Sequence, residues 1–351
     1  MIKVPGSMAK SDPVFLVGLR RVHEGQMVEY IISSNWPWGV VALARGKDLL
    51  ESGASALDSI EETIRIVEDD PTATSVGTGG LPNADGELEL DASIMDGTNM
   101  RAGAVAALQM TKNPISVARK VMELTPHVLL AGEGAKKFAR QCGFPEYNSL
   151  TAEAVTTWKR LRETMVSSYG DPKSMKKTFD EILGYDTDIE TLAKSLMAVY
   201  GQHLGGTVGV LARDSRRNVA AGASTSGWAM RFPGRVADTA ITGAGTYANK
   251  VAAATATGVG EVSIRQSLSK MVCDLVESGL APEVACETAL RKVLSVEKFS
   301  HLIAVTCIDV ECNVGGSCTK AGFQYQYMRR GDSKPVIVRP EPVAREEESA
   351  R

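Results

Sequence analysis

A threonine preceded by two glycines opens an apolar segment of this 351-residue chain, and its position could support nucleophilic chemistry. The segment runs from His203 to Ala212 and places Thr207 directly after Gly205 and Gly206. If the peptide bond before Thr207 were cleaved, a free α-amine, with a reference pKa of about 7.7 to 8.0, would lie beside the threonine hydroxyl. This amine can accept the hydroxyl proton at neutral pH, so one residue would supply nucleophile and base. The alternative is a glycine turn that leads into a half-buried strand.

Polar and glycine-rich blocks lie on both sides of this threonine in a fixed order. They are Ser34–Trp38, Ser75–Asn83, Leu90–Gly97 and Asn113–Val121 upstream, and Ala223–Gly227, Phe232–Thr239, Thr242–Ala248 and Ala254–Glu261 downstream. In order and spacing the chain resembles the glycosylasparaginase and plant-type asparaginase family of N-terminal-nucleophile hydrolases. The resemblance covers roughly residues 28–142 and 203–329, and several blocks in fixed order are more specific than one glycine pattern.

The resemblance implies a role for four residues in catalysis. Thr207 is expected to attack the side-chain carbonyl of an aspartyl amide, giving a β-aspartyl ester that water then resolves. Thr225 resembles the family's second threonine, which hydrogen-bonds to the nucleophile and tunes it. Thr257 and Gly258 resemble the oxyanion hole, where a hydroxyl and a backbone N–H face the developing negative charge. On the residues alone, Thr225 would be a strand end and Gly258 a glycine beside a helix.

Substrate binding is expected from Arg235 and Asp238, which lie three residues apart after a Pro-Gly pair. A guanidinium suits an α-carboxylate and a carboxylate holds an α-ammonium, so both together fit the L-aspartyl group that the family implies. The alternative is an ordinary surface ion pair. Ser75 resembles a residue near the nucleophile's amine. Trp36 resembles the aromatic wall of the glycosylasparaginase pocket and is also a candidate core anchor.

The chain departs from both branches of the family. Glycosylasparaginases typically have His-Asp-Thr at the cut, where this chain has Gly-Gly-Thr, so the Asp thought to assist self-cleavage is missing. Plant-type asparaginases carry Gly-Thr there but begin with a His-Gly-Gly-Ala-Gly segment that this chain lacks. The Asn35–Trp38 opening is closer to the glycosylasparaginase one.

We therefore expect an autocatalytically processed amidohydrolase for L-aspartyl β-amides, most like glycosylasparaginase. An isoaspartyl peptidase and L-asparaginase is the alternative within the family. A remote alternative is a non-catalytic or nucleotide-binding protein with glycine-rich loops. Gly77–Gly80 and Gly243–Gly245 do not fit the full spacing of a Walker or dinucleotide fingerprint, which weighs against that alternative.

Composition agrees with a globular enzyme of this kind. A net charge of −3 and a pI near 5.9 argue against a nucleic-acid or anionic-membrane surface. Met1–Lys10 has no apolar h-region, and no run approaches the roughly 18 to 20 apolar residues of a membrane span, so a cytoplasmic protein is expected. The resemblance implies a small-molecule L-aspartyl amide as ligand and a homodimer of α–β heterodimers.

The six cysteines include no Cys-x-x-Cys pair, and the chain has four histidines, so we expect reduced thiols with no metal and no cofactor. A disulfide among Cys307, Cys312 and Cys318 stays open at this point.

The elements that must position these residues follow from the hydrophobic patterns. The patterns predict strands at residues 28–32, 88–95, 302–309 and 323–329, a hairpin over 208–222, and helices at 57–67, 114–124, 264–275 and 282–293. The resemblance implies an α/β (α+β) fold, a four-layer αββα sandwich formed by both halves of one domain. The cut would give an α subunit, residues 1–206, and a β subunit, residues 207–351. Charged segments over 150–206 have the composition of a flexible connector.

Overall fold

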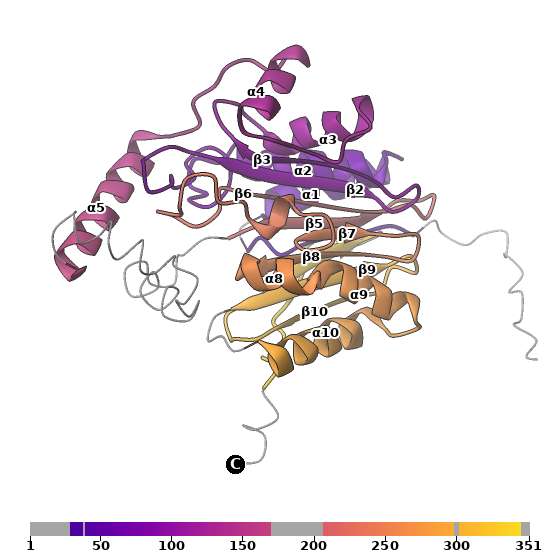
Figure 1. Ribbon diagram of the computed structural model, residues 1–351. Helices are drawn as coiled ribbons and strands as arrows, with labels where there is room; N and C mark the ends of the chain where they lie inside the picture. Colours follow the sequence, from indigo (N-terminus) through magenta and orange to yellow (C-terminus); the bar gives the residue numbers. More distant parts are fainter. Residues whose placement is uncertain (1–28, 38, 170–205, 298–301, 345–351) are drawn as a thin grey trace, which may run out of the picture.

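Strands at the centre and helices outside make up the layers of the structure (Figure 1). The structure is a computed structural model that describes residues 29–37, 39–169, 206–297 and 302–344. The strands are β1 Ile31–Ser34, β2 Leu90–Asp96, β3 Arg101–Leu108, β4 Leu129–Ala131, β5 Val208–Arg213, β6 Val219–Thr225, β7 Thr246–Ala248, β8 Ala252–Gly258, β9 Ile303–Asp309, β10 Val314–Cys318, β11 Tyr325–Arg329 and β12 Val336–Val338. The helices are α1 Val40–Glu51, α2 Ala56–Glu68, α3 Pro114–Leu124, α4 Gly132–Gln141, α5 Ala152–Tyr169, α8 Gly260–Gln266, α9 Leu268–Glu277 and α10 Pro282–Val296, with a 3₁₀ turn, η2, at Asp238–Ala240.

Two sheets pack against each other through one face each. The larger sheet has the strand order β12-β11-β1-β5-β6-β2-β3-β4, and the smaller has the order β10-β9-β8-β7. Between them, Leu211 and Ala221 of the larger sheet share a buried cluster with Ala253 and Ile308 of the smaller. Helices α1, α2 and α3 cover the outer face of the larger sheet, and α9 and α10 cover that of the smaller. The predicted four-layer αββα sandwich is therefore confirmed.

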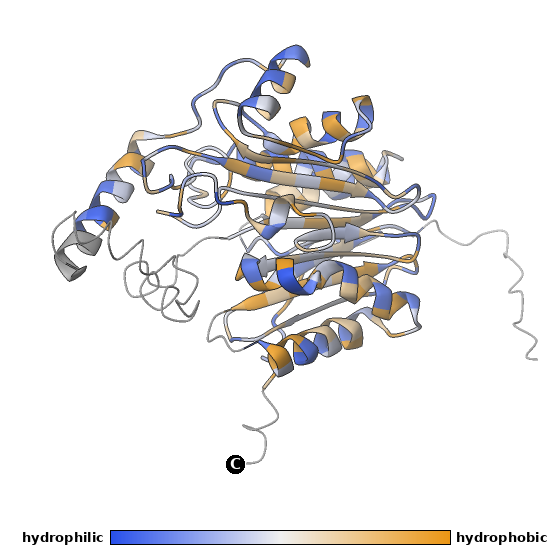
Figure 2. Cartoon of the chain, viewed as in Figure 1, coloured by the Kyte–Doolittle hydropathy of each residue, from blue (hydrophilic) through white to orange (hydrophobic). Residues whose placement is uncertain are grey.

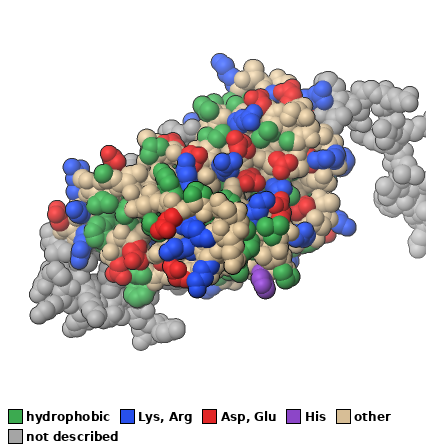
Figure 3. All heavy atoms as spheres, turned by 90° about the horizontal axis from the view of Figure 1, so that it is seen from above, with side chains coloured by type: hydrophobic (Ala, Val, Ile, Leu, Met, Phe, Trp, Pro, Cys, Tyr) green, Lys and Arg blue, Asp and Glu red, His purple; other side chains and the backbone are tan. Residues whose placement is uncertain are grey.

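The outer helices are amphipathic, as their position requires. Figure 2 shows hydrophobic residues concentrated on the strands and on the inward sides of these helices. Figure 3 shows basic and acidic side chains interspersed over the face seen from above. Within the described ranges, no helix combines the length and the apolar character that a membrane crossing requires.

Local signals explain why α2 forms where the sequence predicts it. Its residues Ile60 and Ile64 are fully buried one turn apart. The helix begins with a capping box, in which the Ser55 side chain accepts a hydrogen bond from the Asp58 amide and the Asp58 carboxylate accepts one from the Ser55 amide. Helix α3 likewise begins with its predicted Pro114 in the first turn.

The predicted hairpin is present and sets the position of Thr207. Strands β5 and β6 pair antiparallel, with Val208 opposite Ser224. Thr207, directly before β5, therefore lies beside Thr225, at the end of β6. On its other side β6 pairs with β2, where Thr225 is opposite Asp91. The register of the larger sheet thus brings three polar residues to one end of neighbouring strands.

Two segments differ from the sequence-based expectation. The helix predicted over 264–275 is two helices, because Ser267 has a φ of +48° and separates α8 from α9. Where the sequence predicts a flexible connector, residues 152–169 form helix α5. Its Ala154 and Trp158 pack on Leu81 and Met230, since apolar residues one turn apart give this charged segment an apolar stripe. Residues 170–205 lie outside the described part of the chain.

The cysteines are separated by the fold. All six are free thiols. Cys307, Cys312 and Cys318, which are close in sequence, lie in three different hydrophobic clusters. The structure therefore contains no disulfide among these three residues.

Close packing of β3 on α3 generates a stability prediction. A Cβ on Gly103 would come within 2.1 Å of the Ala118 carbonyl oxygen and 2.5 Å of the Met122 amide nitrogen. Because both neighbours are backbone atoms, Gly103→Ala should lower the free energy of unfolding by roughly 1–3 kcal/mol. Gly134→Ala in α4, where nothing lies within 4 Å of the new Cβ, should raise it by roughly 0.5–1 kcal/mol. Urea denaturation measures both, and a Gly103→Ala midpoint equal to the wild-type one would contradict the packing argument.

Candidate active site

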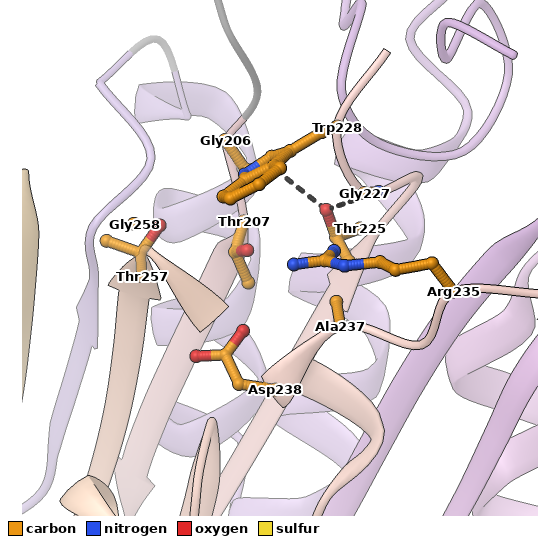
Figure 4. A pocket seen from close by; sticks show the side chains of 10 residues that line it. All are labelled: Gly206, Thr207, Thr225, Gly227, Trp228, Arg235, Ala237, Asp238, Thr257 and Gly258. Carbon is orange, nitrogen blue, oxygen red and sulfur yellow. Dashed lines mark hydrogen bonds between the residues drawn. The ribbon is translucent and has the colours of Figure 1, made fainter. Parts of the chain in front are cut away.

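A hollow at the ends of β5, β6 and β8 contains most of the residues that the sequence singles out (Figure 4). It is lined by Gly206, Thr207, Thr225, Gly227, Trp228, Arg235, Ala237, Asp238, Thr257 and Gly258. These residues come from two strand ends of the larger sheet, one strand end of the smaller sheet, and the loop from β6 to η2. Residues far apart in sequence are thus brought together where the two sheets meet.

Thr207 lies in the middle of this hollow. Figure 4 shows its side chain between Thr257 and Arg235, with Asp238 below it. Only 8% of the residue is exposed, and its Oγ1 is 3.5 Å from Oγ1 of Thr239. Thr239 is fully buried, and its carbonyl oxygen accepts a hydrogen bond of 2.5 Å from the Ser93 hydroxyl. Thr239 is not among the residues predicted from the sequence, where its one signal is its place at the end of the block that contains Arg235 and Asp238.

Thr225 contacts the peptide bond that precedes Thr207. Its Oγ1 lies 3.0 Å from the Gly206 carbonyl oxygen and 3.2 Å from the Ser75 carbonyl oxygen, and it accepts a hydrogen bond from the Gly227 amide. The hydroxyl is thus placed to donate to the carbonyl of Gly206. This arrangement can polarise that carbonyl towards attack.

Ser75 and Trp36 lie directly behind Gly206. A Cβ on Gly206 would come within 3.1 Å of both the Ser75 hydroxyl and the Trp36 ring. Trp36 is 8% exposed and belongs to the main hydrophobic cluster of the larger sheet. In this structure the aromatic ring that lines the hollow is Trp228. Trp36 therefore packs as a core residue that also restricts the residue before Thr207.

Arg235 is held on two sides. Its Nε and Nη2 lie 2.9 and 2.8 Å from Oε1 of Glu261, and its guanidinium carbon stacks 4.7 Å from the centre of the Trp228 ring. Such contacts fix the plane of the guanidinium. Glu261 and Trp228 were not assigned a role from the sequence, although Glu261 ends one of the blocks of the resemblance.

Asp238 is fully buried in the wall of the hollow. Burial raises the pKa of its carboxyl to about 7; the Arg235 guanidinium opposes this rise and the Glu261 carboxylate adds to it. The Oδ2 atom has no hydrogen-bond partner within the described residues. A Cβ on Gly260 would lie 3.0 Å from Asp238 Oδ1 and 3.1 Å from Arg235 Nη2, so a larger residue would require these charged side chains to shift by a few tenths of an ångström. An open carboxylate oxygen beside a fixed guanidinium suits a ligand that carries both an ammonium and a carboxylate group.

Thr257 and Gly258 end β8 on the opposite side of Thr207. Gly258 has a φ of +116°, and a Cβ there would come within 2.0 Å of the Leu302 carbonyl oxygen. Only glycine fits this position. The residue ends β8 and lies two residues before α8 begins, so it also flanks a helix, as its local sequence suggests.

The glycine-rich segments considered as phosphate loops pack against backbone. Gly77 and Gly79 have positive φ values, and Cβ atoms there would collide with the backbone of Glu68 and Pro71. Gly245 packs in the same way on the backbone of Asp238. These glycines thus serve close chain packing around the hollow. Within the described ranges, no group of three His, Cys, Asp or Glu side chains could hold a metal ion.

Comparison with known proteins identifies the family of the chain. Residues 37–338 match the model of a protein family described as Asparaginase. The chain is 44% identical to the plant-type L-asparaginase of Pyrococcus horikoshii over 282 residues, which cover 80% of this chain and 86% of that protein. It is 37% identical to the N(4)-(β-N-acetylglucosaminyl)-L-asparaginase of Elizabethkingia miricola over 302 residues, 84% of this chain and 80% of that protein. It is also 37% identical to the isoaspartyl peptidase/L-asparaginase of Macaca fascicularis over 271 residues, 76% and 79% of the two chains.

The raised pKa of Asp238 generates a prediction about pH. The ionised carboxylate attracts an ammonium group, and it takes up a proton as the pH falls through about 7. The dissociation constant for L-aspartate should therefore be flat above about pH 8 and rise by up to about tenfold per pH unit below 7. Calorimetric titration between about pH 5.5 and 8.5 measures this. Asp238→Asn should bind weakly at every pH, and a wild-type affinity that does not change over the range would contradict the assignment.

Proposed function

The chain belongs to the asparaginase family of N-terminal-nucleophile hydrolases, and on that premise we propose that it is a self-cleaving amidohydrolase of L-aspartyl side-chain amides. One observation carries the proposal. The Thr207 hydroxyl shares a hollow with a guanidinium and an open carboxylate, the two groups that recognise the ends of an α-amino acid. The amide of an aspartyl side chain would then reach the hydroxyl.

Self-cleavage would begin with attack of the Thr207 hydroxyl on the carbonyl carbon of Gly206. The C–N bond breaks as the C–O bond forms, giving an ester and freeing the α-amine, and water then hydrolyses the ester. The Thr225 hydroxyl, 3.0 Å from the Gly206 oxygen, would stabilise the negative charge that develops there. The products are residues 1–206 and 207–351, two subunits of one domain.

In turnover the freed amine of Thr207 would take the proton from its own hydroxyl as the hydroxyl attacks the substrate amide. Thr257 and Gly258 would face the oxyanion, while Arg235 and Asp238 hold the α-carboxylate and α-ammonium. The proton passes to the leaving nitrogen, and water resolves the β-aspartyl ester by the same route in reverse.

For the leaving group we favour ammonia, which makes L-asparagine the substrate. This choice is supported by the four plant-type L-asparaginases that are 41–44% identical to the chain and by the Gly-Gly-Thr sequence that spans the proposed cut. N4-(N-acetylglucosaminyl)-asparagine is the second candidate. It is supported by the Asn35–Trp38 opening and by similarity to glycosylasparaginases at 34–37% identity.

Self-cleavage is tested by intact-mass measurement of purified protein over time. We expect wild-type protein to convert to fragments 1–206 and 207–351, and Thr207→Ala to remain one chain. Thr225→Val should slow conversion by about 10²-fold or more, because the carbonyl loses its donor, whereas Thr225→Ser keeps the hydroxyl and most of the rate. A wild-type chain that is fully active without being cut would exclude Thr207 as an N-terminal nucleophile.

Substrate choice is tested on the cleaved protein with L-asparagine, a β-aspartyl dipeptide and N4-(N-acetylglucosaminyl)-asparagine. We expect the highest kcat/KM for L-asparagine and none for D-asparagine. Arg235→Lys should lower kcat/KM by about 10- to 100-fold, since lysine keeps the charge but loses the planar fork. Unchanged kinetics in this variant would remove Arg235 from the substrate site.

A further inference from the structure

The loop from Thr225 to Asp238 has little regular structure, yet it carries Arg235. Two carboxylates, Asp91 of β2 and Glu89 directly before it, bind the loop backbone on both sides of that arginine. Oδ2 of Asp91 accepts a hydrogen bond of 2.8 Å from the Ala237 amide. The Glu89 carboxylate accepts from the Gly234 amide, at 3.0 Å to Oε1 and 3.3 Å to Oε2.

A buried arginine completes this group. Arg231 is 4% exposed, and its Nη2 lies 2.6 Å from the Glu89 carbonyl oxygen and 3.5 Å from Glu89 Oε2. Its Nη1 lies 3.3 Å from the carbonyl oxygen of Trp228, the residue on which Arg235 stacks. Burial lowers the pKa of Arg231 and raises that of Asp91, so each charge is costly to keep in this place.

The sheet is locally irregular at Asp91. Leu90 pairs with Leu108 and Ala92 pairs with Val105, so β3 contains one extra residue opposite Asp91. Ala107 in this bulge has a φ of +47°, which is unfavourable for a residue with a side chain. Its amide donates a hydrogen bond of 2.8 Å to Oδ1 of Asp91. Bulges of this kind redirect side chains beside active sites, and here the carboxylate joins the bulge to the loop.

A contribution to stability does not explain why these buried charged side chains are present. Buried ion pairs contribute little net stability compared with apolar side chains of similar size, and the strained Ala107 adds a further cost. These side chains do fix the backbone amides of Gly234 and Ala237, which lie one residue before and two residues after Arg235. A side chain that binds a substrate must be held within about 0.5 Å of its productive position to be effective.

We propose that Asp91 and Glu89 are positioning residues for substrate recognition, which hold Arg235 where it can bind the α-carboxylate of the substrate. This inference rests on the proposed function. Both residues act through the loop, so their loss should weaken binding of the substrate and leave self-cleavage at Gly206 unchanged.

The test compares Asp91→Asn and Glu89→Gln with Asp214→Asn. Each carboxylate oxygen of Asp91 accepts a hydrogen bond from one backbone N–H. In asparagine one of these oxygens is replaced by an NH₂ group, which would face a backbone N–H donor with no acceptor between them. Asp214 is a matched control, since it is fully buried and accepts backbone amides in the β5–β6 turn, away from the lining of the hollow. For L-asparagine we expect KM to rise about 10- to 100-fold in Asp91→Asn and less in Glu89→Gln, with kcat within about threefold of wild type. Asp214→Asn should change neither constant.

A double variant shows whether Asp91 acts through Arg235. In an Arg235→Lys background, Asp91→Asn should add little further loss in kcat/KM, because the group that it positions is already gone. A KM unchanged in both Asp91→Asn and Glu89→Gln, or an equal further loss in the Arg235→Lys background, would overturn the positioning role. If Asp91→Asn does not fold, Glu89→Gln and its double variant give the same comparison. A cleaved wild-type protein that hydrolyses no aspartyl amide would instead contradict the proposed function, and with it the positioning role.

Discussion

The antiparallel register of β5 and β6 is the constraint on which the site depends. Because Val208 lies opposite Ser224, the hydroxyls of Thr207 and Thr225 are fixed at one end of two paired strands. From there Thr225 reaches the carbonyl of Gly206. A shift of one residue would turn every side chain of the strand to the other face of the sheet and destroy this contact. Both sheets and their helix layers hold that register in place by burying the faces of β5 and β6.

The charged side chains around these threonines are largely shielded from solvent. Asp238 is fully buried and Arg235 is held between the Trp228 ring and Glu261. In such surroundings an ion interacts more strongly with a partner than it does in water, but it is costly when unpaired. The rise in the pKa of Asp238 to about 7 is the direct result of that cost. A ligand that brings an ammonium group would supply the missing partner.

Glycines permit the close approaches that bring these groups together. Gly260 separates Asp238 from Arg235, and Gly258 lies against the backbone of Leu302. Gly206 leaves room for Trp36 and Ser75 directly behind the residue that precedes the nucleophile. In each case a side chain would push apart two parts of the site. Their small size therefore matters as much to this site as the polar groups do.

The sequence by itself determined the parts of this protein that depend on neighbouring residues. The hairpin over 208–222 and the apolar spacing within α2 and α3 depend on residues close in sequence, and the structure has each of these elements where it was predicted. The capping box of α2 is equally local, although it was recognised only in the structure. The ordered blocks around Thr207 also identified the family and the four-layer fold. Thr207 could be named as a site candidate because it follows two glycines at the start of an apolar segment, and Thr225, Arg235, Asp238, Thr257 and Gly258 because each lies within such a block.

Only the tertiary structure decided which groups act on these candidates. Asp91 binds the amide of Ala237 across 146 positions of sequence, and Ser93 holds the carbonyl of Thr239 across the same separation. No local pattern records such a contact, because it exists only after strands and loops from both halves have packed. For the same reason the amphipathic pattern of the segment that forms α5 did not reveal that it packs on Leu81 and Met230. Local propensity determines where the helices and strands form. Burial and long-range pairing determine which side chains contact each other in the site.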